Sequence, residues 1–156
     1  MWRAVVVGVG TGCRHDDGLG PAVAVSIAGL QLPGVEVVTS PGDLTQLLDL
    51  WHDADLAVVI DAVLRTPSRP GRIEWIDAES ADEAVPTTSC HALGVFEAVR
   101  LGRSLGRLPG RLVIVAVDAA CLDLGIGLSA AVAAAVPSAV VTVVAELARS
   151  RLSVEG

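Results

Sequence analysis

The chain has 156 residues, and 52% apolar against 19% charged residues excludes an intrinsically disordered protein. This length predicts one domain, residues 1–156, with a substantial buried core. All eleven basic residues are arginine and the formal net charge is −7, so we expect no nucleic-acid partner, which would require a basic surface. Three cysteines, Cys13, Cys90 and Cys121, are too few for a disulfide framework and indicate a reducing cytoplasm.

Short apolar segments alternate with segments of helical spacing along the chain. The predicted strands cover residues 4–10, 35–40, 55–63, 72–77 and 111–118. The predicted helices begin near Pro21, after the Asp43 cap (44–51), at 91–105 and after the Ser129 cap. The segment 72–77 alternates apolar and polar residues, which indicates a half-exposed, antiparallel edge strand. The pattern predicts a three-layer α/β sandwich whose five-stranded, twisted and mostly parallel sheet has helices on both faces.

The segment 130–148 is apolar enough to resemble a membrane span. Its valines recur at helical spacing, Pro137 interrupts it and Glu146 lies near its end. We therefore expect a helix packed on the sheet and no membrane association. The chain shows no heptad pattern or long apolar stripe, so we expect a monomer.

Ligands of such sandwiches bind at the carboxyl ends of the strands, which directs attention to four residues. Asp16 and Asp17 lie in the loop after the first strand, Asp61 ends a buried strand, and His91 begins a helix. Each has an ordinary structural interpretation: helix-dipole charge for the acid pair, a hydrogen-bonded cap for Asp61, and an exposed histidine. Together, two carboxylates and an imidazole form a ligand set that suits nickel, zinc or manganese and leaves coordination positions open.

The glycine-rich turn after the first strand also resembles a nucleotide-binding loop. The dinucleotide fingerprint fails here, because Cys13 stands where its last glycine belongs and Ser40 ends the second strand without an acid. We expect these glycines to permit close backbone packing instead.

Four segments, in order, resemble the motifs of the hydrogenase maturation proteases. These segments are VVGVGTGCRHDDGLG, VVIDAV, TSCHALG and GLSAAVAAAVP, and together they cover nearly the whole chain. The sequence departs from the family pattern at Thr11, where asparagine is usual, in the loop from Ser40 to Asp43, and at Cys90, where serine is common.

The resemblance implies a cytoplasmic endopeptidase. Such enzymes remove a C-terminal extension from the large-subunit precursor of a nickel–iron hydrogenase after nickel insertion. The family's nickel-contacting residues fall on Asp17, Asp61 and His91. The precursor would supply the nickel, with zinc or cadmium as surrogate ions.

The resemblance leaves the nucleophile open. A metal-activated water, with Asp17 or Asp16 as base, is one hypothesis. Gly10, Thr11, Gly42 and Asp43 are the candidate substrate-binding residues. Cys13 and Cys90 would flank the expected metal site. The ordinary interpretation is that both are small loop residues, and the sharper hypothesis is that the two thiols add redox sensitivity or metal affinity.

Three alternatives remain at this point. A non-catalytic metal-sensing or chaperone relative would keep Asp17, Asp61 and His91 but would cleave nothing. A Cys–His protease would use Cys90 or Cys13 with a histidine. A nucleotide-binding domain would be stabilised by its nucleotide.

Overall fold

The computed structural model describes residues 1–78 and 90–155, with the side chains of residues 90–93 and 155 left out of the description. Its strands are β1 (Ala4–Val9), β2 (Val35–Ser40), β3 (Leu56–Val63), β4 (Ile73–Asp77) and β5 (Arg111–Asp118). Its helices are the short 3₁₀ helix η1 (His15–Gly18), α1 (Leu19–Ala28), α2 (Leu44–Trp51), α3 (Cys90–Leu105) and α4 (Ala130–Glu155). Residues 79–89, between β4 and α3, lie outside the described residues.

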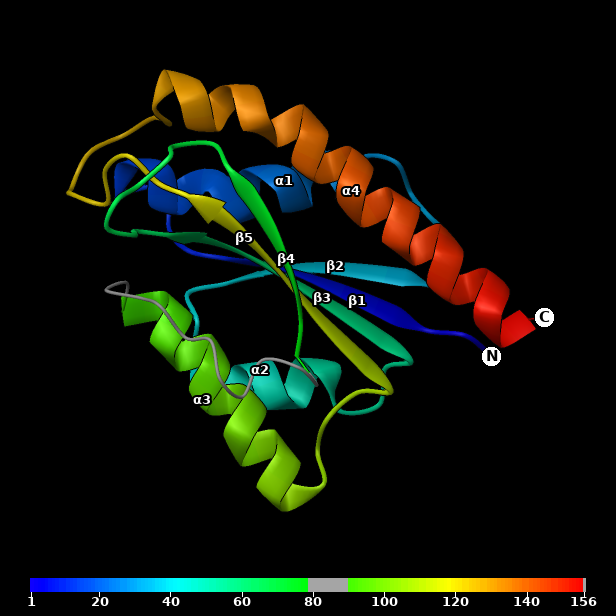
Figure 1. Cartoon of the computed structure of the whole chain (residues 1–156). Coiled ribbons are helices and arrows are strands. Elements are labelled where there is room, and N and C mark those ends of the chain that lie inside the picture. Colours follow the sequence, from blue (N-terminus) through cyan, green and yellow to red (C-terminus); the bar gives the residue numbers. More distant parts are fainter. Residues whose placement is uncertain (79–89, 156) are drawn as a thin grey trace.

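The described strands form one sheet in the order β2-β1-β3-β5-β4. Neighbouring strands are parallel except β4, which pairs antiparallel with β5 at the edge. Helices α1 and α4 cover one face of the sheet, and α2 and α3 cover the other (Figure 1). The predicted three-layer sandwich, including its antiparallel edge strand, is confirmed.

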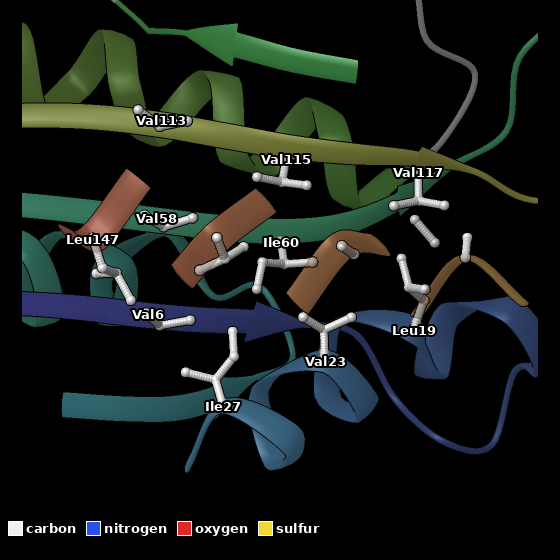
Figure 2. Close-up of a cluster of buried hydrophobic side chains, with 14 of the residues drawn as sticks. Val6, Leu19, Val23, Ile27, Val58, Ile60, Val113, Val115, Val117 and Leu147 are labelled. Carbon is white, nitrogen blue, oxygen red and sulfur yellow. The ribbon is translucent and has the colours of Figure 1, made fainter. Parts of the chain in front are cut away.

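Two buried apolar clusters fill the space between the layers, because side chains alternate along each central strand. In β3, Val58 and Ile60 face α1 and α4, whereas Ala57 and Val59 face α2 and α3. Figure 2 shows the first cluster, in which valines of β1, β3 and β5 lie together with side chains of α1 and with Leu147 of α4. Every residue of β3 is buried, so a polar side chain on this strand costs folding free energy unless a partner compensates it.

Helix α4 is long and apolar enough to cross a membrane by length and composition alone. Its buried positions, among them Val132, Val143 and Leu147, belong to the apolar cluster that lies between the sheet and the helices α1 and α4. The predicted packing of this helix on the sheet is therefore confirmed. The helix runs unbroken through Pro137. Proline removes one backbone hydrogen bond there, and core contacts on both sides of it hold the helix together.

Candidate active site

The site lies where β1 and β3 end and where η1 and α1 begin. A Cβ on Gly8 would collide with the carbonyl of Gly20, and a Cβ on Gly20 would collide with the carbonyls of Val9 and Ile60. Only glycine allows this close approach of α1 to the two strands. The approach brings η1, with both of its aspartates, over the carboxyl edge of the sheet.

Asp61 is a buried carboxylate that the described residues compensate only weakly. Its side chain is 1% exposed, and neither oxygen has a hydrogen bond of good geometry with any described residue. Burial, with the nearby charge of Asp17, raises the pKa of Asp61 well above its ordinary value, and the amide of Ala62 offsets this only in part. By strand alternation Asp61 faces the same side as Val59, which is the side covered by α2 and α3.

Asp17 lies close enough to Asp61 for the two charges to interact, and it too is only 1% exposed. Its Oδ2 accepts a hydrogen bond from the backbone N–H of Thr11, at 2.9 Å. Gly10 has φ +134°, and a Cβ there would collide with the Asp17 carbonyl, so this turn requires glycine. The contact uses the backbone amide of Thr11, so it does not depend on whether threonine or asparagine stands at this position.

Asp16, the other acid of the pair, is committed to a different task. Its Oδ2 accepts hydrogen bonds from the amides of Ala120 and Cys121 and from the Ser129 hydroxyl, and its Oδ1 accepts from the Ser129 amide at 2.7 Å. Burial alone would raise the pKa of Asp16, but these hydrogen bonds together lower it. Asp16 therefore fastens the β5–α4 loop to η1. Ser129 directly precedes α4, as predicted, and its hydroxyl donates a hydrogen bond to Asp16.

His91, the third expected ligand, lies in the first turn of α3, so its position in the chain matches the prediction. Its side chain lies outside the described residues, as does that of Cys90. Among the side chains that the structure does describe, no group of three acids, histidines or cysteines could hold a metal ion. Cys13 is free and exposed. The metal set and the role of the two thiols remain predictions.

The candidate substrate-binding loop connects β2 with α2. Asp43 caps α2 by accepting a hydrogen bond from the amide of Gln46 at 3.0 Å, as predicted. Gly42 has φ +98°, and its carbonyl lies 3.5 Å from where a Cβ on Gly94 of α3 would stand. The loop thus borders the first turns of α3. Substrate contact by Gly10, Thr11, Gly42 or Asp43 remains a prediction.

Two further residues at this edge were missed by the sequence analysis. Asp118 ends β5, is 1% exposed and pairs with Arg65 at 3.0 Å. The sequence feature that could have indicated Asp118 is the one that indicated Asp61, an acid toward the carboxyl end of a buried strand. His15 lies against the loop that follows β5, and one ring nitrogen is 3.1 Å from the Gly127 carbonyl. That contact joins residues 112 positions apart, so no local pattern could reveal it.

The fold is a doubly wound α/β sandwich with buried acids at the carboxyl edge of its sheet. Proteins of this class bind their ligands at that edge. A family model described as hydrogenase maturation protease (HycI) matches residues 29–146. The chain belongs to the hydrogenase maturation protease family, whose members are peptidases. The matched range includes Asp61 and His91 and begins after Asp17.

Solved structures show the same relationship over nearly the whole chain. The hydrogenase-maturating endopeptidase HybD from Escherichia coli is 27% identical, with a TM-score of 0.78 over 95% of this chain and 93% of that one. An endopeptidase from E. coli is 26% identical, with a TM-score of 0.82 and the same coverage. A HybD from Thermococcus kodakarensis, at 23% identity and a TM-score of 0.73 over 93% of this chain and 98% of that one, supports the fold. No curated protein sequence matches the chain.

Proposed function

We propose that this protein removes the C-terminal extension from the nickel-loaded large-subunit precursor of a nickel–iron hydrogenase and recognises the nickel while doing so. One observation carries the metal part of this proposal. Asp61 and Asp17 are two buried carboxylates close to each other, and Asp61 has no good hydrogen bond among the described residues. Two such carboxylates repel each other unless one of them is protonated or a cation lies between them, and a bound cation allows both to be ionised.

A divalent ion fits these residues in charge and in chemistry. Carboxylate oxygens, completed by the imidazole of His91, form a mixed oxygen and nitrogen set suited to nickel, with zinc or cadmium as surrogates. When bound, such an ion supplies positive charge that polarises the groups around it. In our proposal the ion arrives with the precursor and is therefore part of the substrate.

The two neighbouring aspartates have separate tasks in this proposal. Asp17 faces Asp61 and is oriented by the Thr11 amide, which leaves it placed to bind the ion or to accept a proton. Four hydrogen bonds already occupy Asp16. We therefore assign the ligand and base roles to Asp17 and a positioning role to Asp16.

The peptide to be cut would lie along the carboxyl edge, between the turn at Gly10 and Thr11 and the loop at Gly42 and Asp43. The first segment follows β1 and the second follows β2, and the two are adjacent because the Gly10 amide donates to the Ser40 carbonyl at 2.9 Å. The amides of Gly10, Thr11 and Gly42 already donate hydrogen bonds within the protein, so an extended peptide would pair with the carbonyl groups of these turns. We expect the enzyme to act as a monomer in the cytoplasm, without a nucleic-acid or membrane partner.

Deletion of the gene in the source organism tests this function directly. We expect one hydrogenase large subunit to keep its C-terminal extension, measured as intact mass. The wild-type gene and an Asp123→Asn control should restore processing, whereas Asp61→Asn should not. Normal processing in the deletion strain, together with no cleavage by the purified protein, would contradict the proposal and favour a non-catalytic relative.

A further inference from the structure

The loop between β5 and α4 presents two large apolar side chains to solvent. Leu124 is 80% exposed and Ile126 is 90% exposed, and they are two residues apart at the loop's tip. Single exposed apolar side chains are common on soluble proteins, but neighbouring ones on a protruding tip indicate a contact surface. We call Leu124 and Ile126 the apolar tip.

The backbone beneath the apolar tip is held in one conformation. The Gly125 amide donates to the Cys13 carbonyl at 2.9 Å, and the His15 amide donates to the Gly125 carbonyl at 3.0 Å. The His15 ring lies so close that any Cβ on Gly125, at φ +155°, would collide with it. A loop that is already ordered loses little conformational entropy when a partner binds.

The apolar tip is continuous with the candidate active site. The residues that hold it, Cys13 and His15, lead directly into Asp16 and Asp17. Asp16 also binds the start of the same loop through Ala120 and its end through Ser129. In Figure 1 the yellow-to-orange loop projects at the end of the molecule where α1 and α3 begin. A protein bound at the site therefore meets the tip as well.

We propose that Leu124 and Ile126 dock into an apolar recess on the folded body of the precursor, while the carboxylate site handles the segment to be cut. This inference rests on the proposed function. A peptidase of this family must bind a protein, and an uncharged pair of branched side chains matches an apolar protein surface. It offers nothing to a phosphate or a nucleic acid. Docking at a second point would make cleavage depend on a folded precursor.

The test compares Leu124→Ser/Ile126→Ser with a matched control, Val141→Ser/Leu152→Ser. The control pair is 68% and 70% exposed on α4, so both variants remove similar exposed apolar surface. We measure the dissociation constant for the purified nickel-loaded precursor, then KM and kcat for its cleavage. For the tip variant we expect the dissociation constant and KM to rise at least tenfold, with kcat within about twofold of wild type. The control variant should match wild type, and both should keep the wild-type Tm.

Three results would overturn the inference. The first is an unchanged dissociation constant for the tip variant, and the second is an equal loss in the α4 control. The third is self-association of the wild type that the tip variant abolishes, since the tip would then contact a second copy. Binding without cleavage would refute the proposed function alone, because the binding comparison still tests the tip.

Discussion

Asp61 lies two residues before the end of β3, and Asp118 ends the neighbouring parallel strand β5; both are 1% exposed, yet only Asp118 has an ion-pair partner among the described residues. The register pairs Asp61 with Ala116 and Val63 with Asp118, so the two acids lie on the same face of the sheet, two residues apart. Arg65 and the amide of Arg69 compensate Asp118. The fold can therefore neutralise an acid at this edge, and no described side chain does so for Asp61. That contrast supports the proposed binding role of Asp61, whereas Asp118 is engaged in an ion pair within the fold.

Replacement of Asp61 by asparagine should stabilise the metal-free protein at neutral pH. The folded state raises the pKa of Asp61 above its ordinary value of 3.8, so the folded protein holds its proton more tightly than the unfolded chain does. Its ionisation therefore lowers the free energy of unfolding as the pH rises from about 4 through the raised pKa. In denaturant titrations with a chelator present, the free energy of unfolding of Asp61→Asn should equal that of the wild type near pH 4. It should exceed the wild-type value by an amount that grows as the pH rises. An advantage independent of pH would contradict this origin.

Nickel ion should bind the isolated protein through the same carboxylates. Ligand at one hundred times its dissociation constant stabilises a folded protein by about 2.7 kcal/mol. We expect Asp61→Asn and Asp17→Asn each to weaken nickel binding at least tenfold in calorimetric titration. His52→Ala, which alters a half-exposed histidine beyond α2, is the control and should bind as wild type does. Equal affinity in all four proteins would remove both aspartates from the metal site.

Asp16→Ala should damage stability more than metal binding. The substitution leaves the amides of Ala120, Cys121 and Ser129 without their acceptor, which costs about 3 kcal/mol of unfolding free energy. Asp123→Ala, at an exposed position of the loop between β5 and α4, should change the free energy of unfolding by less than about 0.5 kcal/mol. The stability of both variants can be measured by urea titration. A folded Asp16→Ala protein of full stability that fails to cleave would return Asp16 to a catalytic role.

Gly8→Ala tests the close approach of α1 to β1. The added methyl group would collide with the Gly20 carbonyl and crowd Ala24, so we expect a loss of about 2 kcal/mol. Gly12→Ala is the matched control, because a Cβ there meets nothing within 4 Å. The midpoints of thermal unfolding should separate the two variants by several degrees. Equal midpoints would show that α1 can move away from the strand without cost.

Much of the fold could be predicted because its signals are local. The strands at Val35–Ser40 and Arg111–Asp118 have the predicted bounds, and Asp43 caps the predicted helix. The first strand ends one residue earlier than predicted, and α1 begins before Pro21. The 3₁₀ turn at His15–Gly18 lay hidden in a glycine-rich loop, because contacts with distant segments fix its conformation.

The different hydrogen-bond partners of Asp16 and Asp17 could not be predicted from residue type. The two acids are adjacent and identical, and only the fold shows that Ser129, 113 residues away, engages the first. The apolar tip was missed for a similar reason. Leu124 and Ile126 lie in a loop without periodicity, and their exposure depends on how His15 and Cys13 hold the backbone. Local patterns thus predict the elements, whereas long-range hydrogen bonds decide which of two identical side chains holds a distant loop.

The most direct test of the account is the intact mass of a purified large-subunit precursor after incubation with this protein. The account predicts that the nickel-loaded precursor loses its C-terminal extension and that the nickel-free precursor keeps it. Asp61→Asn should leave both forms uncut. Cleavage of both forms at the same rate would contradict nickel recognition, and an unchanged mass of the nickel-loaded precursor would contradict the proposed cleavage.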